Sequence, residues 1–165
     1  WINLPAKDKM TDPKYFEITN DVIQEFEEEG SKVRLVAGEY KGHQGAKGNH
    51  LPTTVLDVTL EAGKEFTFDA NPDNTLFIYI VDGEGSFGDK QTTVPYKTAV
   101  LFGEGDEFLA KAGSEGIRFF LATAPALKEP IAWGGPIVMN TNEELNHTFE
   151  ELQSGTFIKH KPTGV

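Results

Sequence analysis

The 165-residue sequence contains no cysteine, and its charge is mostly of one sign. Without cysteine there can be no disulfide framework, no thiolate metal site and no cysteine nucleophile, which excludes zinc fingers and papain-like hydrolases. Fifteen Lys and Arg face 26 Asp and Glu, giving a formal charge of −11. A phosphate backbone would be repelled, so direct nucleic-acid binding is disfavoured. The longest apolar run, residues 76–81, is far shorter than the roughly 20 residues of a membrane helix, so no membrane contact is predicted.

The first residue is Trp1 rather than Met, and the opening WINLPAKDKM has neither the basic nor the apolar region of a secretory signal. We therefore expect a chain that begins in the middle of a longer protein. Its length is that of one ordinary domain with a single core.

Short segments with a strand pattern lie between frequent glycines and prolines. Residues 55–60 alternate between apolar and polar side chains, which places Asp57 on the outer face of a half-buried strand. Continuous apolar runs at 76–81 and 119–122 predict strands that are covered on both faces. Strands that recur about every 8 to 12 residues predict an all-β sandwich or barrel, with the twelve phenylalanines filling its interior.

The connecting segments are predicted from turn chemistry and charge. An acidic run at residues 25–29 predicts an exposed loop or a short helix end. Glycine, asparagine and proline mark the other connections. The expected turns are Gly63, 71–74, 83–88, 103–106 and 113–116.

One segment near the end of the sequence has clear helical signals. A capping box at residues 141–144 precedes apolar side chains at helical spacing, and Gly155 provides the stop. We predict an amphipathic helix over residues 141–154 that packs its apolar stripe on the outside of the barrel. That stripe consists of Leu145, Phe149 and Leu152.

The four histidines do not have the spacing of a metal site, since no pair shows H-x-H, H-x₃-H or H-E-x-x-H. His43 and His50 share a glycine-rich loop whose flexible backbone leaves a two-histidine site open. The plainer alternative is a pair of solvated loop histidines, because an open loop supplies neither rigidity nor supporting partners.

Other motifs are incomplete as well. Residues 69–73 resemble the start of a calcium loop, but Asn74 and Ile80 stand where glycine and a bidentate glutamate are needed. Residues 83–88 have the letters of G-x-G-x-x-G without a following helix, which predicts a hairpin turn. No serine lies in a G-x-S-x-G elbow. The residues therefore predict no catalytic, cofactor-binding or metal-ligating side chain in this chain.

Three stretches carry a resemblance to a known family: WINLPAKDKMTDPKY (residues 1–15), KTAVLFGEGD (97–106) and EPIAWGGPIVMNTNE (129–143). They are similar to the C-terminal half of pirins, and the resemblance runs from Trp1 to about His160. Pirins are bicupins. The resemblance thus implies a cupin-type, jelly-roll-like barrel with a C-terminal helix. It assigns residues 1–165 to one C-terminal cupin domain, with residues 1–15 as the inter-domain segment.

The family also implies a non-haem metal, usually iron, held by three histidines and a glutamate of the N-terminal cupin. We expect that metal-binding cupin to be missing from this chain, and with it the cofactor. By the resemblance, the ligand positions correspond here to Asp69, Asn71, Thr75 or Leu76, and Phe119, so that no ligand set remains. We expect Phe119 to fill the barrel lumen that a metal would occupy.

Two functions remain open for the full-length protein. In the first, it resembles quercetin 2,3-dioxygenases, in which an iron in the other cupin binds a flavonol, a small aromatic substrate, and activates dioxygen. In the second, it resembles pirins that act without turnover as metal- or redox-responsive binding partners of transcription regulators, through an acidic surface. This domain alone is expected to be inactive. We expect a cytoplasmic protein, or also a nuclear one if the source is eukaryotic.

The expected partner of this chain is its own N-terminal cupin domain. The residues expected at the domain junction lie in two segments and include two amphipathic indole rings, for which ordinary core burial is the open alternative. An isolated half should also expose an apolar patch where the other barrel docks. The candidate junction residues are Trp1, Asn3, Leu4, Pro5 and Trp133.

Overall fold

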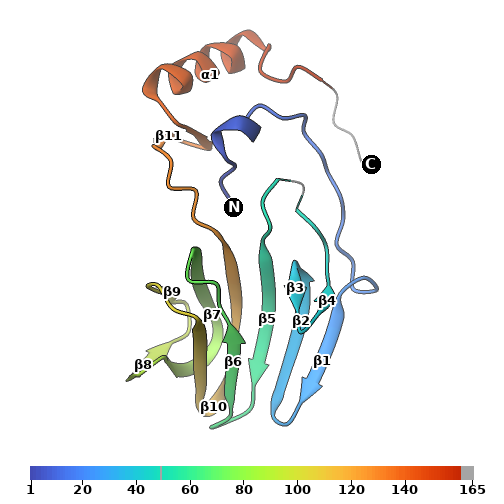
Figure 1. The fold of residues 1–165 in the computed structure, drawn as a ribbon, viewed down its shortest axis with the longest axis vertical. Coiled ribbons are helices and arrows are strands. Elements are labelled where there is room, and N and C mark those ends of the chain that lie inside the picture. The colour runs from blue at the N-terminus through green and yellow to red at the C-terminus, as the bar shows by residue number, and fades with distance from the viewer. Residues whose placement is uncertain (49, 161–165) are drawn as a thin grey trace. The chain divides into compact units, whose positions relative to one another are not determined.

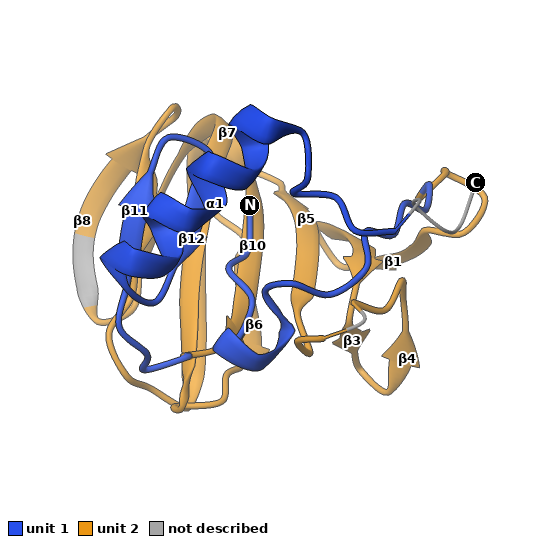
Figure 2. Ribbon diagram, turned by 90° about the horizontal axis from the view of Figure 1, so that it is seen from above, with its two compact units in different colours: residues 1–17, 127–165 blue, residues 18–126 orange. Residues whose placement is uncertain are grey.

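The computed structural model describes residues 1–48 and 50–160, so the last five residues of the expected domain lie outside the described part. The chain divides into two compact units, drawn in different colours in Figure 2. Unit 1 comprises residues 1–17 and 127–165, and unit 2 comprises residues 18–126.

Unit 2 is an antiparallel all-β structure, as the strand pattern predicts (Figure 1). Its main sheet has the order β1-β2-β5-β10-β7-β8, with β6 paired to β10 and β9 paired to β7, and β3 pairs with β4 in a separate hairpin. The strands are β1 (Gln24–Glu28), β2 (Ser31–Ala37), β3 (Glu39–Tyr40), β4 (His43–Gln44), β5 (Thr54–Leu60), β6 (Glu65–Asp69), β7 (Asn74–Phe87), β8 (Lys90–Pro95), β9 (Ala99–Leu101) and β10 (Glu107–Pro125).

The long strand β10 holds this barrel together. Its first residues pair with β6, its last residues pair with β5, and β7 follows it along most of its length. The alternating inward side chains of these strands form one apolar core. That core contains Leu56, Val58, Ile78, Phe119 and Leu121, each of them fully buried.

The prediction that the runs 76–81 and 119–122 are covered on both faces is wrong. Burial alternates along each run, so that Phe77 and Tyr79 are each 42% exposed and Phe120 is 39% exposed. The pleat sends successive side chains to opposite faces, and only the inward face meets the core. The expectation that all twelve phenylalanines fill the interior fails for the same reason, and also for the exposed Phe16.

Two expected turns are also wrong, because residues 83–87 lie within β7 and residues 113–116 lie within β10. The glycines permit a close approach of these two paired backbones and do not mark a chain reversal. A Cβ on Gly83 would lie 2.2 Å from the carbonyl oxygen of Gly116, and the register shifts nearby. Gly88 does lie in the turn before β8, and Gly63, 71–73 and 103–106 do lie between strands.

The acidic run at 25–29, expected as a loop or helix end, forms most of strand β1 instead. Its alternation explains the difference. Phe26 packs against the core and lies 5.3 Å from the Tyr40 ring, while Glu25 points outward and reaches Lys32 and Arg34 on β2 at 2.6 and 3.1 Å. Cross-strand ion pairs and an inward aromatic ring together favour a strand over an open loop.

Unit 1 contains a short 3₁₀ helix (Ala6–Asp8), the hairpin β11 (Ala132–Gly134) with β12 (Ile137–Met139), and the helix α1 (Asn142–Ser154). The capping box at Thr141 and Glu144 and the left-handed stop at Gly155 are confirmed. Leu145 of the predicted stripe is buried and Phe149 is partly buried, in a small core with Ala132 and Met139. The partner that the stripe covers is therefore this hairpin, which no pattern in the sequence predicted, and Leu152 is exposed.

Candidate functional site

The centre of the barrel is filled by aromatic rings. Phe119 has no exposed surface, and its ring centroid lies 5.9 to 6.2 Å from those of Phe66, Phe87 and Phe108. Carbon rings supply no lone pair to a cation, so this interior does not fit the iron that the fold family implies. In the described part of the chain, no three histidine, aspartate or glutamate side chains come together as a ligand set.

The barrel becomes polar at one end, where three neighbouring strands continue their inward register with polar residues. Thr54 is in register with Leu56 on β5, Asn74 with Leu76 on β7, and Thr123 with Leu121 on β10. The pairing sets Thr123 directly opposite Thr54. The apolar core therefore ends in a layer of hydroxyl and amide groups.

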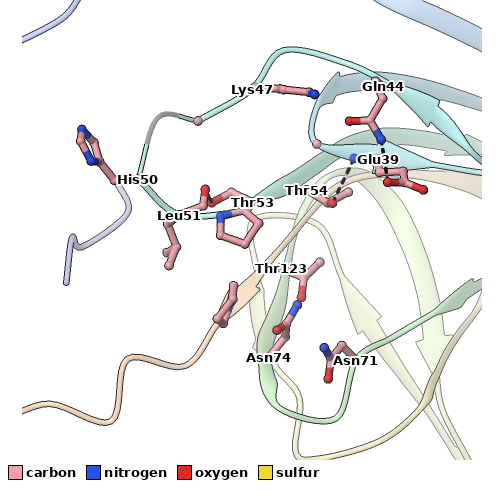
Figure 3. Close-up of a pocket in the computed structure, with 14 residues that line it drawn as sticks. Glu39, Gln44, Lys47, His50, Leu51, Thr53, Thr54, Asn71, Asn74 and Thr123 are labelled. Atoms are coloured by element: carbon pink, nitrogen blue, oxygen red, sulfur yellow. Dashed lines mark hydrogen bonds between the residues drawn. The ribbon is translucent and has the colours of Figure 1, made fainter. Parts of the chain in front are cut away.

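A pocket of about 550 Å³ opens above this layer (Figure 3). A second hollow of about 470 Å³ adjoins it, since Glu39, Thr54, Asn71, Asn74 and Thr123 line both. Both volumes lie in the range of small-molecule sites. The larger pocket also has apolar walls, which are Leu51, Pro52 and Pro125.

Several polar groups around this pocket are held in place by hydrogen bonds. Gln44 Nε2 donates to Glu39 Oε2 at 2.6 Å, and the Glu39 backbone N–H donates to Thr54 Oγ1 at 3.4 Å. Asn71 Oδ1 accepts from the backbone N–H of Asp73 at 3.0 Å, which fixes the turn before β7. Figure 3 shows Gln44 and Glu39 on one side and Asn71, Asn74 and Thr123 on the other.

The Thr123 side chain has no hydrogen-bond partner among the described residues, although its Oγ1 is buried. The side chain as a whole is only 6% exposed. A buried hydroxyl without a partner is uncommon in native structures, because it carries a desolvation cost that nothing offsets. This unpartnered hydroxyl lies in the wall shared by both hollows.

The other buried polar residue of this sheet, Asp57, is fully paired. Its carboxylate accepts two hydrogen bonds from Arg118, at 2.8 and 2.9 Å, and lies 3.3 Å from Arg34 Nη1. Burial opposes ionisation of Asp57, but the Arg118 and Arg34 guanidiniums outweigh it and hold the pKa of the carboxyl below its ordinary value. Alternation placed Asp57 on an outer, half-exposed face, but the two arginine side chains cover it there, leaving 3% exposed.

Beside this ion pair, the outer face of the sheet carries exposed apolar side chains. Phe120 stands opposite both Asp57 on β5 and Tyr79 on β7, and Phe77 pairs with Leu101 on β9. Cross-strand pairing makes these side chains neighbours. We call Phe77, Tyr79, Leu101 and Phe120 the outer apolar face.

The candidate histidines are placed separately. His43 lies in β4, with its ring 5.0 Å from that of Phe26. His50 lines the polar pocket, whose lining does not include His43. Of the positions matched to family ligands, Asn71 lines the pocket, Asp69 and Thr75 are exposed, and Leu76 and Phe119 are core residues.

The expected junction residues all lie in unit 1. Trp1, Asn3 and Leu4 share a shallow hollow of about 200 Å³ with β12, whereas Pro5 precedes the 3₁₀ helix. Trp133 lies outside that hollow and donates from its indole Nε1 to the Gly135 carbonyl at 2.7 Å. Trp1 is 82% exposed and Trp133 is 71% exposed, so neither ring is a core residue.

Comparison with known proteins identifies the family. The model of the pirin C-terminal cupin domain matches residues 55–158. The chain belongs to the pirin family. A pirin-like protein of Solanum lycopersicum is 36% identical over 157 residues, which are 94% of this chain and 54% of that protein. Pirin of Rattus norvegicus is 32% identical over 93% of this chain and 54% of the rat protein.

Among solved structures, a quercetin 2,3-dioxygenase from Acinetobacter baumannii superposes on this pirin domain with a TM-score of 0.86 and 34% identity. The match covers 95% of this chain and 55% of that one. The chain thus spans about half the length of the curated relatives and of the solved structure that it matches. The cupin-type all-β fold and the family that the sequence motifs indicated are both confirmed.

The polar layer of this pirin domain was missed by sequence reasoning. Thr123 directly follows the apolar run 119–122, and extending the period of two from Phe119 through Leu121 reaches it as an inward position. That signal was available. The pairing of Thr123 with Thr54 could not be predicted, because neither segment alone determines the register between two strands that are distant in sequence.

No described helix is both long enough and apolar enough to cross a bilayer.

Proposed function

We propose that this chain is the metal-free C-terminal cupin of a pirin-like protein that, at full length, is a non-haem iron dioxygenase of quercetinase type acting on flavonols. The observation that carries the proposal is the match of nearly the whole chain to about half of a protein whose structure is that of a quercetin 2,3-dioxygenase. The iron, which would activate dioxygen, belongs in this proposal to an N-terminal cupin that is not part of this chain.

The aromatic interior favours a structural, non-catalytic role for this domain. Phe119, which the resemblance matches to a ligand position of metal-binding cupins, is enclosed by Phe66, Phe87 and Phe108, and this aromatic surrounding supports a metal-free centre. The domain therefore acts as a rigid scaffold and as part of the wall that encloses the substrate. Its own side chains would hold and orient the other half rather than carry out a chemical step.

The outer apolar face supports docking of that other half. Three aromatic side chains and Leu101 are adjacent on neighbouring strands and exposed, whereas monomeric proteins rarely leave such groups in water without a partner. Trp1 and Trp133, both exposed in unit 1, are the further candidates for this junction. We propose the protein's own N-terminal cupin as the partner, because the relatives extend well beyond the length of this chain.

The catalytic part of the proposal is tested by oxygen uptake. Full-length, iron-loaded protein should consume dioxygen when quercetin is added, while the isolated chain should consume none and should contain no stoichiometric iron. Elemental analysis that finds iron bound stoichiometrically to the isolated chain would contradict the assignment of the metal to the other domain. Full-length, iron-loaded protein that leaves quercetin unchanged would favour the alternative of a non-enzymatic partner of transcription regulators.

The docking part has its own measurement. A dye that fluoresces on apolar surfaces should bind the isolated chain and bind much less to the full-length protein. Phe120→Ser combined with Tyr79→Ser should reduce dye binding by the isolated chain, while Thr59→Ser, an exposed position on β5, serves as the control. Equal dye binding by the isolated chain and the full-length protein would show that the outer apolar face is not the junction.

A further inference from the structure

The polar end of the barrel is a second candidate site, separate from any metal chemistry, and it does not depend on the proposed function. Its deepest group is the Thr123 hydroxyl, which is buried and without a partner among the described residues. A hydrogen bond from an occupant of the pocket would satisfy that hydroxyl and recover the cost of its desolvation. The structure thus contains an unpaired polar group beside a cavity of ligand size.

The side chains around the cavity select the chemistry of the occupant. Hydroxyl and carboxamide groups predominate in the wall common to the two hollows, where Thr54, Asn71, Asn74 and Thr123 are joined by one carboxylate, Glu39. Each of these neutral groups can donate and accept, which suits a ligand whose own groups do both. A hydroxyl group has that property and carries no charge.

Other ligand classes fit this wall less well. An anion would meet the Glu39 carboxylate in the shared wall, which contains neither lysine nor arginine, since Lys47 lines only the larger pocket and Lys41 only the second hollow. A divalent cation would find a single carboxylate there, and no three ligating side chains of the described chain come together. An entirely apolar molecule would leave Thr123 unpaired and would bury the amides of Asn71 and Asn74 without partners.

Two polar side chains of the pocket wall are held in place before any ligand binds. Asn71 is fixed by the Asp73 N–H, and Glu39 is held by Gln44, so these groups lose little freedom on binding. Leu51, Pro52 and Pro125 supply an apolar wall against which the carbon face of a ring can pack. Polar groups on one side and apolar groups on the other match a cyclic polyol or pyranose.

We propose that the end of the barrel formed by Thr54, Asn74 and Thr123 is a binding site for a small neutral polyhydroxylated molecule. Thr123 and Asn74 hydrogen-bond its hydroxyl groups, and the ring carbons lie toward Pro52 and Pro125. The carbon-filled interior around Phe119 forms the floor beneath this site, so the ligand stays at the open end.

Ligand titrations followed by amide chemical shifts test this proposal, with methyl β-D-glucopyranoside as the probe. We expect saturable shifts at residues of β5, β7 and β10 that line the pocket. Cyclohexanol, with the same ring size and one hydroxyl, should give no saturable shifts, and glucuronate should bind more weakly because its carboxylate meets Glu39. Shifts that stay linear for every probe, or that map outside the pocket, would overturn the proposal.

Variants connect the binding to the unpaired hydroxyl. Thr123→Val keeps the shape of the side chain and should weaken binding of the glucoside about three- to tenfold, the loss expected for one neutral hydrogen bond. Asn74→Ala, at the partly buried first residue of β7, should weaken it comparably and does not alter the fully buried core. Thr59→Val, on the outer face of β5, is the matched control and should leave the affinity unchanged. Unaltered affinity in both pocket variants would exclude this site.

Discussion

Phe119 and Thr123 are inward-facing residues four positions apart on strand β10, yet they stand in opposite environments. Phe119 is surrounded by aromatic rings, whereas Thr123 presents a buried hydroxyl that has no hydrogen-bond partner among the described residues. The difference teaches that one barrel combines an aromatic centre, whose rings offer no lone pair to a cation, with a polar end that lines a pocket.

The largest effect is expected from emptying the centre. Phe119→Ala should lower the free energy of unfolding by about 3 to 5 kcal/mol, because it removes a fully buried ring and leaves a cavity. Phe120→Ala, the neighbouring outward position, should cost about 1 kcal/mol or less, since that ring is partly in water already. Urea denaturation measures both, and similar losses for the two variants would contradict the assignment of inner and outer faces.

The next effect concerns a buried polar group that does have partners. Asp57→Asn should lower the free energy of unfolding at pH 7 by about 1 to 3 kcal/mol, because charged hydrogen bonds to Arg118 and Arg34 are lost. Both arginines are partly exposed, so water can solvate them in the variant and limits the loss.

The pH dependence gives this prediction its sign. The pKa of Asp57 is lowered in the folded protein, so the ionised carboxylate stabilises the fold fully above the ordinary aspartate pKa of about 3.9. That contribution is lost as the pH falls through the lower, folded-state pKa. Wild-type and Asp57→Asn proteins should therefore differ at pH 7 and converge in acid. A difference that stays constant down to the acid transition would contradict the assignment.

The smallest effect has the opposite sign. Thr123→Val should leave the free energy of unfolding unchanged or raise it by about 1 kcal/mol, because it removes an unpaired buried hydroxyl while preserving the shape of the side chain. Thermal unfolding of the unliganded protein, with Thr59→Val as the reference, measures this change. A clear loss of stability would mean that the hydroxyl already has a partner in the folded protein.

How far the sequence predicts this molecule depends on how local each signal is. The capping box at Thr141 and the stop at Gly155 act within one helical turn, and both are confirmed. Strand β5 was also predicted from its own alternation. Predictions failed where the outcome rests on a distant strand: Asp57 is buried by side chains from β2 and β10, and Gly83 lies within β7, close against the backbone of Gly116 on β10.

The candidate site shows the same division. Phe119 could be predicted as an interior ring because its position follows from the apolar run around it. Thr123 could be placed inward by the same period, but its lack of a partner follows only from where Thr54 and Asn74 end up. Turn glycines at 113–116 were misread because a glycine that relieves a close backbone approach looks, in sequence, like one that reverses the chain.

The central position of β10 in the sheet has a consequence for how the chain acquires its structure. β10 is the last strand of the barrel to be synthesised, yet β5, β6 and β7 all hydrogen-bond to it. During translation, the edges of β5, β6 and β7 that pair with β10 stay unpaired until residue 125 has left the ribosome. Folding of the barrel is then governed by long-range pairing, which slows it and leaves strand edges exposed to aggregation in the meantime.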